Sequence, residues 1–263
     1  MKEGSYQFEK LVSQELEIAC LLERAQLRLD GFSDLLRHHK MPMSGVILEV
    51  GCGHGLRTHL IAKHAKQAEV IGIDRSPELL KHAHDAYQKT SNLSFQQADL
   101  YDLPFPDNSI DFIYVRLVFM HLLDPISALL SLKRVLKPGG RLLIEDGDRD
   151  CMFFEPMPLH FQQFWQKVQE GQRRLGGDPN VGRKLGTYLK KTHFQHLQIE
   201  AQPIIGDGDD IAFLVRTLMP SLNLYLLPEE RAFGELAIKE LAELSRANDA
   251  SFYHFWFTVS GAK

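Results

Sequence analysis

Cysteine is scarce in this sequence of 263 residues. Its three cysteines, Cys20, Cys52 and Cys151, lie far apart in the chain, with no CxxC pair and no Cys/His spacing typical of a metal site. We therefore expect reduced intracellular thiols, no disulfide framework and no bound metal.

Positive charge and long apolar stretches are also lacking. The formal net charge of −4, without a run of lysine and arginine, argues against nucleic acid as a partner. No stretch of about 18 apolar residues occurs and the first residues are polar, so we expect a cytoplasmic protein without a membrane span. The pairs His38-His39 and His82/His84 lie in polar helical contexts and are expected at the surface rather than as ligands.

The composition that is present suits a globular α/β protein, because 44% of the residues are hydrophobic and 24% are charged. Strand and helix patterns alternate over residues 44–146, which predicts a Rossmann-like, mostly parallel open sheet with helices on both faces. The predicted strands of this core are 46–51, 69–74, 93–98, 110–116 and 140–146.

Outside this core the pattern is mainly helical. Residues 1–40 are predicted to form helices that cap the site, and residues 41–263 form the main domain. The predicted elements after residue 147 are helices at 158–175, 182–192, 210–221 and 228–247 and strands at 196–203 and 252–259.

A glycine-rich turn follows the first predicted strand. Gly51, Gly53 and Gly55 alternate after an apolar run, and a helix pattern begins at Leu56. Leu56 stands where a dinucleotide-binding turn requires its third glycine, and no Lys-Ser or Lys-Thr follows to make a P-loop. With no lysine or arginine inside the turn, the ligand is not predicted to place a phosphate there.

Three carboxylates follow the ends of three predicted strands. Glu49 suits a cation, and Asp74 stands about 20 residues further on, at the offset where a carboxylate binds ribose hydroxyls. Asp99 ends the third strand. Together they predict a nucleoside with a cationic, phosphate-free tail, although Asp74 and Asp99 could instead cap the elements that follow their strands.

Five blocks in register resemble the Rossmann-like (class I) S-adenosylmethionine-dependent methyltransferases, in particular the small-molecule branch that includes quinone-biosynthesis enzymes. The blocks are ILEVGCGHG at 47–55, VIGIDRS at 70–76, ADL at 98–100 with LPF at 103–105, DFIYVR at 111–116 with HLLDP at 121–125, and RVLKPGGR at 134–141.

This resemblance implies S-adenosyl-L-methionine as cofactor. The backbone at Gly51, Cys52 and Gly53 would approach its methionine part, and Glu49 would lie near its ammonium group. Asp74 would hold both ribose hydroxyls.

The adenine and the acceptor side follow from the same blocks. Arg75 would flank the adenine, Asp99 would accept from its amino group, and the Leu100 N–H would meet a ring nitrogen. The carbonyl of Arg116 would accept from the ammonium group, and Tyr6 would close over the cofactor.

The resemblance also implies an antiparallel last strand at 252–260. A helical insertion at about 205–250 would interrupt the final hairpin, as a lid or as a homodimer contact.

Methyl transfer from a sulfonium is an in-line displacement, so the protein mainly aligns the acceptor and excludes water. His121 and Asp148, after the fourth and fifth strands, are the candidate catalytic residues. Each has an alternative: His121 as a packing residue, and Asp148 with Asp146 as a solvated acidic turn. Arg183 is predicted to be structural, paired with an acidic residue.

The acceptor is predicted to be a small, apolar or aromatic molecule methylated on O, C or N. This rests on apolar and aromatic side chains after residue 151. They are Met152, Phe153, Phe154, Met157, Phe161, Phe164, Trp165, Phe213, Leu218, Met219 and Tyr225.

Two alternatives stay open. One is a cofactor-binding protein of this fold that does not methylate, such as a pericyclase or an assembly factor. The other is a protein or nucleic-acid methyltransferase, which the residues 116–119, Arg-Leu-Val-Phe, do not favour, because an Asn/Asp-Pro-Pro-Tyr type of motif would be expected there.

Overall fold

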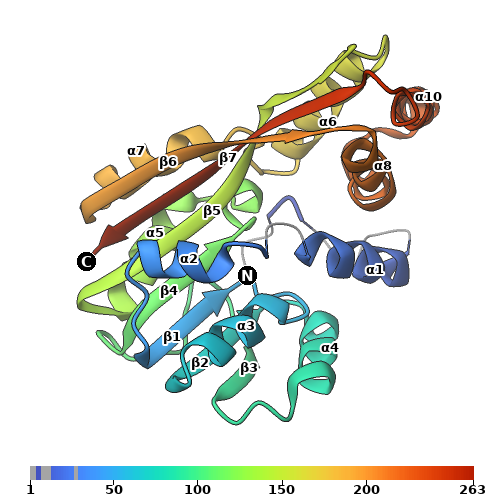
Figure 1. Cartoon of the computed structure of the whole chain (residues 1–263). Helices are drawn as coiled ribbons and strands as arrows, with labels where there is room; N and C mark the ends of the chain where they lie inside the picture. Colours follow the sequence, from blue (N-terminus) through green and yellow to red (C-terminus); the bar gives the residue numbers. More distant parts are fainter. Residues whose placement is uncertain (1–3, 7–12, 27–28) are drawn as a thin grey trace.

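In the computed structural model, which describes residues 4–6, 13–26 and 29–263, seven strands form one sheet (Figure 1). The strands are β1 (Ser44–Val50), β2 (Gln67–Asp74), β3 (Leu93–Gln97), β4 (Ile110–Arg116), β5 (Leu136–Glu155), β6 (Gln195–Gly206) and β7 (Ser251–Ala262). Their spatial order is β3-β2-β1-β4-β5-β7-β6. Strands β1 to β5 are parallel, and β7 runs antiparallel to both of its neighbours. The predicted fold class, with an antiparallel last strand, is confirmed.

Strand β5 is much longer than the predicted 140–146. It continues past the acidic segment after Asp146, and its far end pairs with β7 as far as Glu155 and Ser251. The extension carries aromatic residues, and the rings of Phe154 and Phe252 lie 5.4 Å apart across the strand pair. The acidic residues at the start of this extension are typical of a turn, so the sequence predicted that the strand ends there. The structure shows that the strand continues through them.

The sheet is covered by helices on both faces. One face carries α2 (Phe32–His38), α3 (Leu56–His64) and α4 (Pro77–Tyr87), and the other carries α5 (Pro125–Val135) and α7 (Leu185–Lys191). Central strands are therefore buried on both sides and are apolar almost throughout.

A second core lies beyond the end of the sheet. It is built by α6 (Phe161–Arg174), α8 (Gly208–Thr217), α9 (Met219–Leu222) and α10 (Arg231–Leu244), packed on the extended ends of β5 and β7. The predicted insertion of about 205–250 thus supplies three helices, and Figure 1 shows α8 and α10 together at the far end of the long strands.

The two described N-terminal helices lie in different places (Figure 1). Helix α1 (Gln14–Ala25) contacts α8, whereas α2 packs Phe32 and Leu36 on a face of the sheet. Residues 1–3, 7–12 and 27–28 of the predicted cap lie outside the described residues. Within the described part of the chain, no helix is both long enough and apolar enough to cross a bilayer.

Candidate functional site

The glycine turn lies at the carboxyl end of β1, directly before α3. Gly51 and Gly55 have φ angles of +72° and +83°, which disfavour any residue with a side chain. A Cβ at Gly51 would lie 2.3 Å from Val118 Cγ2, and one at Gly55 would lie 2.5 Å from Phe95 Cζ. The turn is fixed to β2, since the N–H groups of Gly51 and Cys52 both donate to the Ile73 carbonyl.

Gly53 is the open point of this turn. A Cβ built there would meet no atom within 4 Å. Its N–H donates to Asp74 Oδ2 at 2.9 Å, and the Ser76 N–H donates to Oδ1 of the same carboxylate at 2.9 Å. Each carboxylate oxygen keeps a further acceptor position.

Asp74 does not cap the helix after its strand. The N-cap of α4 is Ser76, whose hydroxyl accepts from the Leu79 N–H. Burial raises the pKa of Asp74, opposed by the two backbone donors from Gly53 and Ser76. The carboxylate is therefore held by backbone at the edge where the parallel strands end, the usual position of ligands in this architecture.

Glu49 lies next to this turn on β1 and is only 3% exposed. Thr58 Oγ1 donates to its carboxylate at 2.5 Å, and burial raises the pKa of Glu49 to about 7. The hydroxyl of Thr58 and the positive charges of Arg57 and Arg116 act in the opposite direction. A nearby cation would shift Glu49 to its ionised form.

Asp99 and Leu100 lie beside Asp74. The Ala98 N–H donates to the Asp74 carbonyl at 3.1 Å, which places the end of β3 against the end of β2. Asp99 accepts from the Tyr101 N–H at 3.0 Å, in a turn rather than at a helix. Leu100 is buried.

The two arginines predicted at the cofactor site are placed at the same edge. Arg75 directly follows β2 and is partly buried. Arg116 ends β4, and its guanidinium carbon lies 5.0 Å from the Trp256 ring centroid.

The segment around Tyr6 joins α1 to the site. The Tyr6 hydroxyl donates to Glu17 Oε1 at 3.1 Å, and the Tyr6 ring lies 5.3 Å from the ring of His121. Burial raises the pKa of Tyr6, and the charge of Glu17 adds to this effect. Tyr6 thus lies between the N-terminal helix and the segment after β4.

His121 ends a short 3-10 turn, Phe119–His121. Its Nδ1 lies 3.0 Å from Ser5 Oγ and 3.4 Å from the Tyr225 hydroxyl, and its carbonyl accepts from the Ser5 N–H. Burial, with the charge of Arg149, lowers the pKa of His121 to about 3. A neutral imidazole with so low a pKa is a weak base, so this geometry favours the packing alternative for His121.

Asp148 is completely buried and fully engaged. Arg183 forms a bidentate ion pair with it, Asn180 Nδ2 donates at 3.0 Å, and the Asp150 N–H donates at 3.1 Å. The predicted structural role of Arg183 is confirmed. A carboxylate with this set of partners holds the segment containing Asn180 in place, and the structure gives no support to a catalytic role for Asp148.

Asp146 is the other acidic residue predicted near the site, and it is also completely buried. It accepts from the N–H groups of Met120 and Gly147 at 3.1 and 2.9 Å, so it is not a solvated acidic turn. Burial raises the pKa of Asp146 to about 7. It fixes the segment after β4 to the middle of β5.

Arg149 is a functional candidate that sequence reasoning missed. It is 7% exposed, its guanidinium lies 5.0 Å from the Trp165 ring and 5.8 Å from the Tyr225 ring, and Nε donates to Gln172 at 2.8 Å. Among the described residues, no carboxylate lies within ion-pair distance of Arg149. Its position directly after the acidic residues of β5 did not predict a functional role. The aromatic residues around it come from α6 and from the insertion, which are distant in the sequence.

The fold is a Rossmann-like α/β sheet in which Glu49, Asp74 and Asp99, the carboxylates predicted to bind the cofactor, lie near the carboxyl ends of β1, β2 and β3. The sequence of residues 48–144 matches a family described as a methyltransferase domain.

Known proteins similar to the chain include two methyltransferases and one protein of solved structure. An uncharacterized methyltransferase of Schizosaccharomyces pombe is 37% identical over 53% of this chain and 52% of its own length. A 2-phytyl-1,4-naphtoquinone methyltransferase of Synechococcus elongatus is 35% identical over 45% of this chain and 52% of its own. The chain spans about half the length of these relatives.

The solved structure is a Haemonchus contortus phosphoethanolamine N-methyltransferase 2 in complex with S-adenosyl-L-methionine. It has a TM-score of 0.57 at 19% identity, over 87% of this chain and 51% of that one, which shows a common fold. The chain therefore has a Rossmann-like fold, and its residues 48–144 are similar to a methyltransferase domain.

Proposed function

We propose that the protein is an S-adenosyl-L-methionine-dependent methyltransferase that acts on a small molecule. The observation that carries the proposal is the arrangement of Gly53 and Asp74, where the backbone of an open turn holds a carboxylate whose remaining acceptor positions are available for two hydroxyls. Glu49, buried beside the same turn, supplies a site for a cationic group.

The residues present fit this cofactor. Asp74 would hold the ribose hydroxyls, Asp99 and Leu100 the adenine edge, and the backbone from Gly51 to Gly53 the methionine part. When bound, the cofactor supplies an electrophilic methyl group. The chain aligns the acceptor and excludes water, because the displacement itself needs no protein nucleophile.

The acceptor side is roofed by α1, α6 and the insertion. The aromatic rings of Trp165 and Tyr225 in this region suit an apolar or aromatic acceptor. Arg149 adds a specific expectation, because a buried cation with no carboxylate partner among the described residues favours a ligand with a negative charge. We propose an acceptor that combines an aromatic or apolar body with a carboxylate or phosphate.

Cofactor binding is tested by calorimetric titration of wild type, Asp74→Asn and the matched control Asp85→Asn, which changes an exposed residue of α4. Two charge-assisted hydrogen bonds are worth about 3 kcal/mol together, so Asp74→Asn should weaken binding by about 100-fold. Unchanged affinity in Asp74→Asn would overturn the site.

Methylation is tested by the release of S-adenosylhomocysteine over a panel of acceptors in matched pairs, with and without a carboxylate. Within each pair, the molecule with the carboxylate should be the better acceptor. Arg149→Gln should remove that preference by raising KM for the carboxylate-bearing acceptor. Binding of the cofactor without turnover on any acceptor would favour the alternative, a cofactor-binding protein of this fold that does not methylate.

A further inference from the structure

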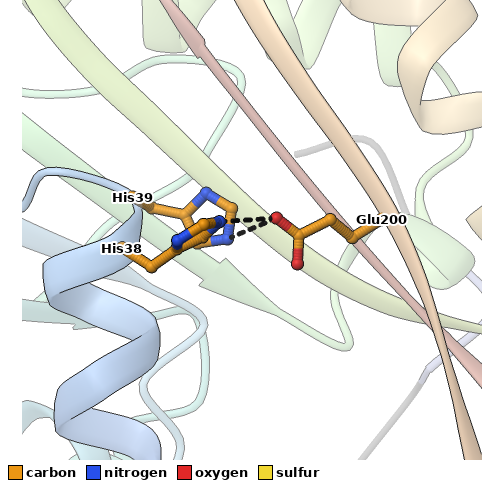
Figure 2. Close-up of side chains that lie close together, drawn as sticks. All are labelled: His38, His39 and Glu200. Atoms are coloured by element: carbon orange, nitrogen blue, oxygen red, sulfur yellow. Dashed lines mark hydrogen bonds and ion pairs between the residues drawn. The ribbon is translucent and has the colours of Figure 1, made fainter.

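A second cluster of ligand-type side chains lies away from the glycine turn, where the end of α2 meets β6. Figure 2 shows two adjacent histidines, His38 and His39, with their rings directed at the carboxylate of Glu200. The pair His38-His39 was expected at the surface, but only His38 is exposed there, while His39 is completely buried.

The three donor atoms converge on one point. His38 Nε2 lies 2.9 Å and His39 Nε2 lies 3.8 Å from the same oxygen, Glu200 Oε1, and the three ligand atoms all lie within 4.8 Å of one another. Tetrahedral zinc with ligand distances of about 2.0–2.2 Å separates its donor atoms by roughly 3.4 Å. Shifts of the donor atoms by up to about an ångström would bring all three within ligand distance of one ion.

The nitrogen of His39 that faces the cluster has no hydrogen-bond partner in the part of the chain that the structure describes. His39 is 0% exposed, and its Nε2 lies too far from Glu200 for a hydrogen bond. Burial of an unpaired imidazole nitrogen is unfavourable, so a ligand at this point would satisfy an atom that the protein itself leaves unsatisfied.

The other ring nitrogen of His39 is already oriented. Nδ1 lies 3.0 Å from Ser260 Oγ on β7, and that hydroxyl lies 3.3 Å from Gln198 Oε1 on β6. When Nδ1 carries the proton and donates to the serine, the lone pair of Nε2 points at Glu200. Histidine ligands of metals are held by a hydrogen bond of this kind on their second nitrogen.

The cluster opens onto a cavity of about 440 Å³. Its lining includes His38 and Glu200 together with Asp30, Asp34 and Glu145. The negative charges of Glu200 and Glu145 act on the pKa of His39 in the opposite direction to the positive charge of Arg141. Three protein ligands beside an open space leave a fourth position for water or a small ligand.

We propose that His38, His39 and Glu200 bind a divalent first-row transition metal that prefers the same ligands as zinc. The bound ion would join α2 to β6. Two imidazole nitrogens with one carboxylate favour such an ion over magnesium or calcium, which prefer oxygen ligands. The site is independent of the methyltransferase proposal, because no residue of the glycine-turn site belongs to it.

The test uses the full chain, purified without a histidine tag and stripped of metal with a chelator. Dialysis against zinc should leave one zinc ion per chain, and Co²⁺ should give the visible absorption of a tetrahedral site. His38→Ala and Glu200→Gln should each weaken zinc binding at least tenfold, and zinc should raise the Tm of wild type but not of these variants.

His82→Ala is the matched control, since it removes an exposed histidine from α4 and should leave zinc binding unchanged. Circular dichroism and the Tm without metal show that each variant is folded. Equal zinc affinity in wild type, His38→Ala and Glu200→Gln, or no retained zinc in wild type, would overturn the proposal and leave the cluster as a hydrogen-bonded contact.

Discussion

Burial of Glu49 bears directly on the proposed function, because it changes the pKa of a carboxylate that is expected to bind the cofactor. An ordinary glutamate is ionised at neutral pH, whereas burial raises the pKa of this one to about 7. A cationic ligand beside this carboxylate would favour its ionised form. The raised pKa gives the proposed cofactor site a measurable signature.

We predict that cofactor affinity rises with pH across neutrality. Below pH 7 Glu49 is protonated in the free protein, and binding of a cationic ammonium requires loss of that proton, so Kd should fall as pH rises from 6 to 8. Calorimetry in buffers of different ionisation enthalpy should show proton release at pH 6. In Glu49→Gln the pH dependence should flatten, and an unchanged profile there would contradict the role of Glu49.

Gly51 gives a prediction about backbone geometry. Gly51→Ala combines a positive φ of +72° with a Cβ 2.3 Å from Val118, so it should destabilise the fold by about 3 kcal/mol and abolish cofactor binding. Gly139→Ala is the control, because its φ is +78° but no atom lies within 4 Å of the added Cβ. Urea unfolding should show a loss of only about 1 kcal/mol for the control.

Among the elements, the core strands were predictable and the extension of β5 was not. The bounds of β1 to β4 agree with the sequence to within a few residues, since each is an apolar run followed by turn residues. In β5 the residues Asp146 and Asp148 looked like an acidic turn. They are buried instead, because the Met120 N–H satisfies Asp146 and Arg183 satisfies Asp148, and such distant partners cannot be read from local composition.

The ion pair between Arg183 and Asp148 should stabilise the contact between β5 and the 3-10 turn Gly182–Lys184. Arg183→Met leaves a completely buried carboxylate without its cation, so the free energy of unfolding should fall by about 3 kcal/mol while cofactor affinity changes little. Arg216→Met, which breaks an exposed pair with Glu23, should cost less than about 1 kcal/mol. Similar losses for the two variants would contradict a buried structural pair.

At the scale of the whole molecule, contacts of the N-terminal segment join parts that are far apart in sequence, and we expect these parts to roof the proposed site. Motif spacing predicted the glycine turn and the carboxylates because those residues follow consecutive strands of one sheet. Ser5 and Glu17 were not predicted, since their partners lie 116 and 204 residues away, at His121 and Ser221. The predicted homodimer through the insertion remains a prediction.

Glu17 joins the parts of this roof and yields the last prediction. It is 4% exposed, and it accepts hydrogen bonds from Tyr6, from Arg24 and from Ser221 of the insertion. Glu17→Ala removes the acceptor shared by the N-terminal segment and the insertion. Hydrogen exchange should therefore speed up in both α1 and the segment around Ser221, while β1 and β4 keep their protection.

The exposed neighbour Glu15 supplies the control, since Glu15→Ala changes α1 without touching these contacts. The roof would order the acceptor more than the cofactor. Glu17→Ala should therefore raise KM for the acceptor by about tenfold, as expected for loss of an interaction worth roughly 1.4 kcal/mol. Cofactor affinity should stay nearly unchanged. Faster exchange confined to α1, with the segment around Ser221 unaffected, would show that the two parts are not coupled through Glu17.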